Sequence, residues 1–206
     1  MTIKGAVASG HVETSRAAAA ILAEGGNAFD AAMAAMCTAC VAEPVLASFG
    51  GGGFLLAHPN QGRHQGRTIV YDFVPQTPRF RAPAADIDFF PVIADFGPTQ
   101  QEFHIGMGSI ATPGFVRGLF EAHRDLGSMP MRRIVEPAIE LARSGVRMNE
   151  MQAYMFGVAG AILQSSEASK VGADHQVAIA KDESSLILSP AMAYGHALGQ
   201  PYGKHH

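Results

Sequence analysis

Apolar residues at the start of the chain follow the spacing of a short strand and then of two helices. The apolar run Ile3–Ala8 predicts a buried strand. Alanine-rich residues over Glu13–Glu24 predict a helix, and Gly25-Gly26 would end it, because glycine adopts the left-handed conformation of a helix C-cap at little cost. A second helix is predicted over Ala28–Val41, and since apolar residues surround it almost completely, we expect it to be buried.

Polar and glycine residues mark the ends of these elements and introduce a hairpin. Asn27, with Asp30 three residues later, has the pattern of a capping box at a helix N-terminus. The glycine run Gly50–Gly53 leads into a predicted strand, Gly62–Gly66 lies in a polar loop, and Thr68–Phe73 is predicted as the returning strand. The first half of the chain therefore indicates helices that flank a two-stranded hairpin.

The second half of the chain is less regular. Residues 75–91 contain four prolines and are predicted to be mostly irregular. Ser109–Thr112 is predicted as a strand, Pro113–Asp125 as a helix and Pro130–Ser144 as a further helix, with Pro137 near a helix start or a kink. From Gly157 onward the periodicity weakens, and the end of the chain shows none.

Composition and charge exclude several functional classes. The chain has 15 basic and 18 acidic residues, which give a net charge of −3. It therefore lacks the dense positive charge that binding to nucleic acid or to an anionic membrane requires. The N-terminus lacks the apolar run of a secretory signal, and the apolar stretch Ala31–Ala42 is too short to span a bilayer. We therefore expect a soluble cytoplasmic protein with neither a nucleic-acid nor a membrane partner, and its two cysteines as thiols.

Two short motifs have a possible chemical meaning that their context disfavours. A phosphate-binding loop needs a Lys after the glycines, or a strand-to-helix glycine turn, and Gly50–Gly53 has neither. We interpret this run as a structural turn that lets another backbone pass closely. Cys37 and Cys40 have C-x-x-C spacing but lie within the predicted apolar helix, without the further ligands that zinc needs. Core packing is the better interpretation for both thiols.

The histidines and a near-terminal threonine offer weaker candidates. His11 lies at a predicted turn before a helix, where capping is favoured over catalysis. His104 is the histidine to test first, with a structural role as the alternative. Removal of Met1 would expose Thr2, whose amine and hydroxyl could form a nucleophile, yet an ordinary predicted strand follows and no processing motif is present. We therefore expect no metal site and no nucleophile at these positions.

The order of motifs resembles one known family. The blocks that carry the resemblance are "EGGNAFDAA", the following Glu-Pro turn, "GGGGF" and "GSIATPGFVRG". Together they are similar to the leading part of the large subunit of γ-glutamyltransferase (γ-glutamyltranspeptidase) precursors. The resemblance extends over residues 4 to 163. The prediction is therefore a family-like domain over residues 1–163 and an irregular tail over 164–206.

The resemblance implies an α/β (α+β) fold, the αββα sandwich of N-terminal-nucleophile hydrolases, present here only in part. Family precursors cleave themselves, and the new N-terminal threonine of the small subunit attacks a γ-glutamyl amide. No cofactor or metal is implied. The implied partners are a small-molecule γ-glutamyl or other acyl amide and a small subunit, or C-terminal chain, that carries the threonine. We expect no catalytic residue in this chain, which alone would be inactive.

One element departs from the family pattern. The family's D-x-R-E-x-A-P segment, whose arginine grips the substrate α-carboxylate, corresponds here to residues 72–78, so the resemblance points to Asp72, Val74, Gln76 and Arg79 as substrate-binding candidates. Val74 stands where the arginine would be, and valine cannot pair with a carboxylate. Arg79 or Arg81 could reach back to the site, the substrate could lack the carboxylate, or a slip in register could place the true counterpart elsewhere.

Two functions are favoured by the sequence, and a third, a nucleotide-binding module, would require Gly50–Gly53 to hold phosphate. The chain is either the N-terminal part of an amidohydrolase that another polypeptide completes, or a non-catalytic truncated or binding subunit that keeps the fold. Either way, the missing layers would leave Phe54–His58 and Thr68–Phe73 with unpaired edges and an uncovered apolar face.

Overall fold

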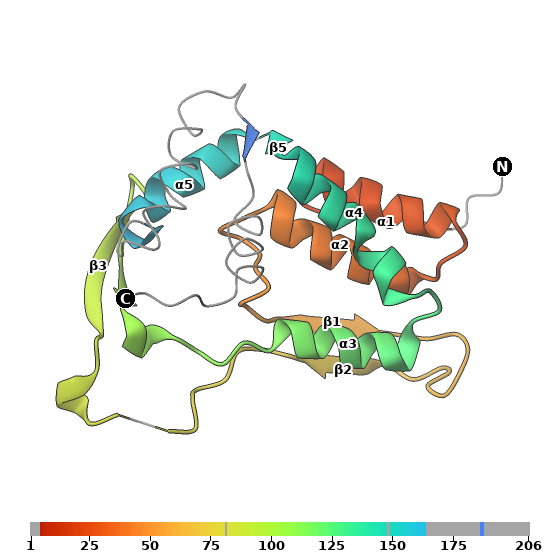
Figure 1. The fold of residues 1–206 in the computed structure, drawn as a ribbon, viewed down its shortest axis with the longest axis horizontal. Helices are drawn as coiled ribbons and strands as arrows, with labels where there is room; N and C mark the ends of the chain where they lie inside the picture. The colour runs from red at the N-terminus through yellow and green to blue at the C-terminus, as the bar shows by residue number, and fades with distance from the viewer. Residues whose placement is uncertain (1–4, 81, 148, 164–185, 188–206) are drawn as a thin grey trace, which may run out of the picture. The chain divides into compact units, whose positions relative to one another are not determined.

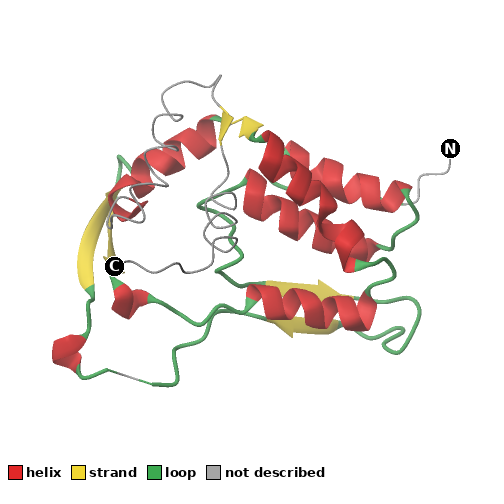
Figure 2. Cartoon of the chain, viewed as in Figure 1, coloured by secondary structure: helices red, strands yellow, loops and turns green. Residues whose placement is uncertain are grey.

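The computed structural model describes residues 5–80, 82–147, 149–163 and 186–187. Helices account for most of the regular structure, together with three separate two-stranded antiparallel sheets (Figure 2). The chain divides into two compact units, one formed by residues 1–77 and 112–141 and the other by residues 78–111 and 142–206. Within the described part, no helix has both the length and the apolar character needed to cross a bilayer.

Two helices form the core of the first unit. α1 (Val12–Ala23) and α2 (Ala28–Ala42) pack side by side along their lengths (Figure 1). Both helices bury small side chains that let their backbones approach closely, namely Ala17, Ala18, Ala31, Ala34 and Ala42. The largest fully buried side chains of this pair are Ile21, Met33 and Val41. The predicted helices and the burial of the second one are confirmed.

The turn between α1 and α2 depends on local sequence signals. Gly25 has φ +96°, which glycine adopts without strain. Asn27 and Asp30 form the predicted capping box: the Asn27 side chain accepts the N–H groups of Phe29 and Asp30, and Asp30 accepts the Asn27 N–H at 2.9 Å. The start of α2 is therefore specified by residues within one turn of it.

Asp30 also ties α2 to a distant loop. It is fully buried, and its carboxylate accepts the N–H of Ser128 at 2.9 Å, the hydroxyl of Ser128 and the N–H of Met129 at 3.3 Å. Burial opposes ionisation, but these hydrogen bonds outweigh it and lower the pKa of Asp30. The ionised carboxylate therefore holds the loop at Ser128 and Met129 against the start of α2.

A two-stranded sheet and α3 form the other layer of the first unit. β1 (Phe54–Ala57) pairs antiparallel with β2 (Ile69–Asp72), and α3 (Phe115–Leu126) lies across them (Figure 1). The opposite face of the sheet is bare: Phe54, Leu56 and Val70 are 67%, 69% and 59% exposed. The expected hairpin is confirmed, and so is its uncovered apolar face within the described residues.

α4 (Met131–Ser144) follows α3, and its residues 131–141 belong to the first unit. Its Arg133 pairs with Glu24 at the end of α1, and with Glu136 on its own helix at 2.9 Å. Pro137 lies inside the helix rather than at its start. The predicted bounds of α3 and α4 agree with the structure to within one residue at most ends.

The second unit consists of a hairpin, a helix and short turns. β3 (Phe90–Asp95) pairs antiparallel with β4 (Gln100–Ile105), and α5 (Glu150–Leu163) contacts β3. The Tyr154 hydroxyl on α5 donates to the Phe96 carbonyl at 3.0 Å. The remaining elements are the 3-10 turns η1 (Ala84–Asp86) and η2 (Met107–Ser109) and the paired short strands β5 (Val146–Arg147) and β6 (Leu186–Ile187).

Three sequence-based predictions are corrected by the structure. Residues 5–8 of the predicted first strand are exposed and extended without strand pairing, because no described strand lies beside them to satisfy their backbone groups. Ser109–Thr112 is not a strand: η2 takes its start, and Thr112 makes one bridge to Gln76 before Pro113 ends the pairing. The hairpin β3–β4 was not predicted, because its Pro91 suggested an irregular segment.

Candidate functional site

The candidate site forms where the glycine run, β2 and α3 meet. Gly52 lies so close to β2 that a Cβ on it would be 2.3 Å from the Phe73 carbonyl oxygen. Gly118 on α3 lies equally close on another side, since its Cβ would be 2.4 Å from the Phe73 Cβ. The predicted role of Gly50–Gly53 as a turn that admits a close backbone is therefore confirmed.

A cavity of about 640 Å³ lies beside this junction, within the first unit. One wall comes from the end of β2 and the segment after it, and the other from the start of α3. The lining residues are Val70, Tyr71, Asp72, Phe73, Val74, Gln76, Thr112, Pro113, Gly114, Arg117, Gly118 and Glu121. Three of the four predicted substrate-binding residues, Asp72, Val74 and Gln76, are thus brought together on one wall.

Local hydrogen bonds hold that wall in shape. The Asp72 Oδ1 accepts the Val74 N–H at 3.1 Å, and the Gln76 side-chain amide donates to the Val74 carbonyl at 3.1 Å. The backbones of Gln76 and Thr112 exchange two hydrogen bonds, of 3.0 and 2.8 Å, which link the two walls. Val74 itself is half-buried and presents an apolar side chain. It offers no charge to a ligand.

The edge of β2 that faces away from β1 is unpaired within the described residues. The Phe73 N–H donates to Gly53, so in this antiparallel register every second residue of β2 exchanges hydrogen bonds with β1. The backbone groups of Val70 and Asp72 therefore point to the free edge, and both residues line the cavity. A bound molecule can use these backbone groups as well as side chains.

The second wall supplies charges that the motif comparison missed. Arg117 and Glu121 lie one helical turn apart on α3. The signal in the sequence was weak, because both residues are on the polar flank of an ordinary amphipathic helix. Nearby, the Tyr71 hydroxyl donates to Asp125 at 3.3 Å, and burial together with that carboxylate raises the pKa of Tyr71.

The other predicted candidates lie elsewhere. Arg79 belongs to the second unit, where its guanidinium carbon is 5.9 Å from the Phe80 ring centroid, and it does not line the cavity. Arg81 and Thr2 are outside the described residues. His104 stacks on Phe89, with ring centroids 4.6 Å apart, and its Nε2 is 3.7 Å from Glu102. The substrate-binding role of the four motif residues stays a prediction.

The remaining motif residues are structural. The His11 side chain accepts the Glu13 N–H at 3.2 Å and caps α1, as predicted. Cys37 and Cys40 are free thiols buried in α2, and burial raises the pKa of both to about 12. Within the described part of the chain, no group of three or more His, Cys, Asp or Glu side chains is arranged to hold a metal ion.

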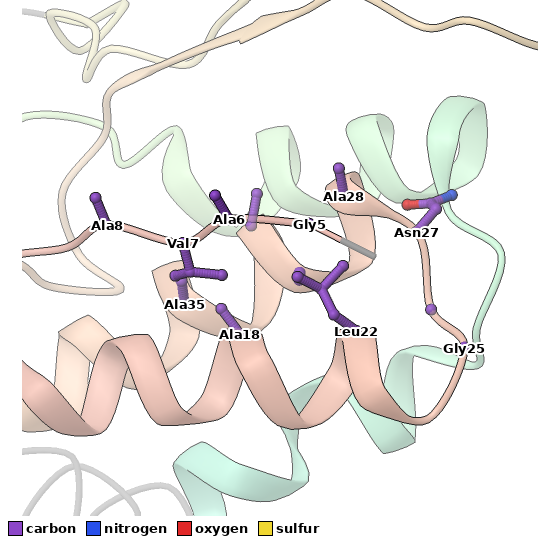
Figure 3. Close-up of a pocket in the computed structure, with 13 residues that line it drawn as sticks. Gly5, Ala6, Val7, Ala8, Ala18, Leu22, Gly25, Asn27, Ala28 and Ala35 are labelled. Carbon is purple, nitrogen blue, oxygen red and sulfur yellow. The ribbon is translucent and has the colours of Figure 1, made fainter. Parts of the chain in front are cut away.

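A second cavity, of about 590 Å³, is a poorer candidate for binding. It lies where the extended segment 5–8 runs alongside α1 and α2 (Figure 3). Glycine, alanine, valine and leucine make up its lining except for Asn27, whose side chain already caps α2. The cavity beside β2 differs in having a strand edge and charged side chains, so we take it as the candidate site.

The chain matches one protein family and several of its relatives. The model of the family described as gamma-glutamyltranspeptidase matches residues 14–191. The chain is 33% identical over 147 residues to the protein named Acylase ACY 1 proenzyme of Pseudomonas sp. (strain V22), covering 69% of this chain and 25% of that protein. It is 36% identical over 149 residues to the Glutathione hydrolase proenzyme of Escherichia coli (strain K12), covering 71% and 24%. The chain thus spans about a quarter of the length of these curated relatives.

Solved structures agree with this match. The gamma-glutamyltranspeptidase of Pseudomonas nitroreducens, complexed with L-DON, aligns with a TM-score of 0.70 and 27% identity, covering 94% of this chain and 54% of that chain. The gamma-glutamyltranspeptidase of Helicobacter pylori aligns with a TM-score of 0.69 and 26% identity, covering 84% and 47%. The mixed helix and strand fold is therefore that of part of these N-terminal-nucleophile hydrolase chains, as predicted.

Proposed function

Because the chain belongs to the γ-glutamyltranspeptidase family, we propose that it is the N-terminal part of an enzyme that hydrolyses or transfers acyl amides. One observation supports a direct role in substrate binding. Asp72, Val74 and Gln76, which match the family's substrate-binding motif by position, line a single cavity together with the start of α3. We propose this cavity as part of the acyl-binding site.

The attacking group, in this proposal, comes from a threonine at the N-terminus of a small subunit. The α-amine of that threonine takes the hydroxyl proton while the oxygen attacks the amide carbonyl carbon. The C–N bond then breaks, the amine leaves with the proton, and an acyl ester remains. Water or an amino acceptor cleaves that ester and regenerates the threonine. The described lining of the cavity fits a binding role, since it offers charged side chains, a half-buried valine and a free strand edge to an acyl chain.

The acyl group is a γ-glutamyl group or a related one. The relatives differ in what their names state, since one is an acylase and the other a glutathione hydrolase. At position 74 this chain has valine where the family has the arginine that pairs with the α-carboxylate of glutamate. This difference favours an acyl group that is recognised in another way. The chain's wall of Asp72, Val74 and Gln76 therefore determines which acyl chains fit.

The proposal is tested by reconstituting the enzyme. The chain is produced alone and together with the rest of a family precursor, that is, the remaining part of the large subunit and the small subunit, and release of p-nitroaniline from γ-glutamyl and glutaryl p-nitroanilides is followed at 410 nm. We expect turnover only from the pair. A small subunit whose N-terminal threonine is changed to alanine is the control and should abolish turnover.

The opposite results are equally informative. Turnover by the chain alone would disprove the separate nucleophile. A correctly assembled pair that binds acyl amides without cleaving any would show that the chain is a non-catalytic binding subunit.

A further inference from the structure

The proposed acyl-binding cavity contains a single basic side chain. Arg117 is the only Lys or Arg among its lining residues, and Asp72 and Glu121 supply negative charge. Glu121 would be the natural partner of Arg117 one helical turn away, but its carboxylate pairs with Arg124 instead. Within the described part of the chain, no ion pair or hydrogen bond of the Arg117 guanidinium is present. Its donors are therefore available to a ligand.

Close packing fixes where Arg117 lies. It is in the first turn of α3, between Phe115 and Gly118. The Phe115 ring packs edge-on against Phe73, with centroids 6.0 Å apart, and Gly118 approaches the same side chain without room for a Cβ. Because both neighbours hold α3 against β2, the backbone of Arg117 has a defined position beside the strand edge. Only its side chain needs to move to meet a ligand.

The backbone at the start of α3 leaves the charge of the cavity to this side chain. The N–H groups of Gly114 and Phe115 both donate to the Gly51 carbonyl, at 3.2 and 3.1 Å. These two donors are therefore used in joining α3 to the glycine run. Among the lining residues, the guanidinium of Arg117 is then the one positive charge that a negatively charged group can meet.

We propose that Arg117 binds a carboxylate on the acyl chain of the substrate and so determines the specificity of this site. The inference rests on the proposed function, since it takes the cavity as the acyl-binding site. A guanidinium matches a carboxylate with two parallel hydrogen bonds, which Val74 cannot make. Asp72 and Glu121 would repel a second negative charge, so the preferred ligand has one carboxylate and an uncharged amide end.

Binding is measured on the 206-residue chain by NMR titration, which does not depend on turnover. Glutaramate carries one carboxylate and one amide, and pentanamide has a similar chain without the carboxylate. We expect the chain to bind glutaramate more tightly than pentanamide or inorganic phosphate. Arg117→Gln should weaken glutaramate binding about tenfold, the worth of a hydrogen bond to a charged group. It should leave pentanamide binding unchanged, and Arg117→Lys should lie in between because lysine lacks the planar fork.

Arg132→Gln is the matched control, since Arg132 is exposed on α4 and does not line the cavity. Far-UV circular dichroism verifies that each variant is folded. The inference is wrong if glutaramate binds no more tightly than pentanamide, if phosphate binds equally well, or if the variants at positions 117 and 132 behave alike. If acyl p-nitroanilides are turned over but Arg117→Gln binds glutaramate as tightly as wild type does, this inference is refuted and the proposed function stands. If glutaramate binding depends on Arg117 but the reconstituted enzyme turns nothing over, the proposed catalytic function is refuted and the carboxylate contact of Arg117 stands.

Discussion

Replacing Gly118 by alanine tests the packing that shapes the candidate site. The new methyl group would lie 2.4 Å from both the Cβ and the Cγ of Phe73, far closer than carbon atoms can approach. These atoms are the base of a buried side chain, so they cannot move aside without shifting β2 or α3. Such overpacking costs about 1–3 kcal/mol. Alanine recovers about 1 kcal/mol of helix propensity, which leaves a net loss of up to about 2 kcal/mol.

Gly157 provides a control with the opposite expected sign. It lies in the middle of α5, and an added Cβ would have no atom within 4 Å. Gly157→Ala should therefore gain up to about 1 kcal/mol from helix propensity alone. The same substitution in two helices thus separates the packing term from the propensity term.

Urea unfolding followed by circular dichroism at 222 nm measures both variants, because the chain has no Trp for a fluorescence signal. With a typical slope of about 2 kcal/mol per molar urea, the midpoint of the Gly118→Ala variant should fall by up to about 1 M. Gly118→Ala should also weaken glutaramate binding, since Arg117 moves with α3. If Gly118→Ala stabilises the chain as Gly157→Ala does, α3 is not packed on Phe73 and the description of the cavity is wrong.

Three further predictions concern stability and reactivity. The lowered pKa of Asp30 contributes stability that is fully present above about pH 4 and lost as the pH falls through the folded-state pKa. The difference in free energy of unfolding between wild type and Ser128→Ala should therefore become smaller from pH 7 to pH 3. A difference that stays constant would refute the hydrogen bond from Ser128 to the ionised carboxylate. Val45 has φ +79°, so Val45→Gly should raise the free energy of unfolding by about 1 kcal/mol, and a lower urea midpoint would contradict that strain. Burial raises the pKa of Cys37 and Cys40 to about 12, so neither should react with Ellman's reagent at pH 8 until urea unfolds the chain.

Much of the first unit could be predicted because its signals are local. The end of α1 at Gly25 and the capping box of α2 each lie within a few residues of the structure they specify. The hairpin β3–β4 was missed for a physical reason. Phe96 donates to Thr99, so Pro91 lies at a non-hydrogen-bonded position of the register, where its missing N–H faces the free edge. A proline at such a position does not prevent strand pairing. The sequence alone does not give the register, so it could not show that Pro91 occupies such a position.

The candidate site was only half predictable. The wall of Asp72, Val74 and Gln76 is continuous in sequence, so a motif comparison could find it. Arg117 lies on a helix more than forty residues later in the sequence. Only the close approach of α3 to β2 brings it to the same cavity. Arg79 shows the converse, because nearness in sequence did not place it on the lining. The domain boundary at residue 163 and the cytoplasmic location stay predictions.

Phe73 directly follows β2, and both the glycine run and α3 pack against it. Such a shared contact makes local opening cooperative: none of the three segments can separate from the others without exposing this ring to water. Amide hydrogens in β2 and in the first half of α3 should therefore exchange with deuterium together, at one common opening free energy. The walls around the ligand would then be set before any substrate arrives, so that little ordering entropy is lost when it binds.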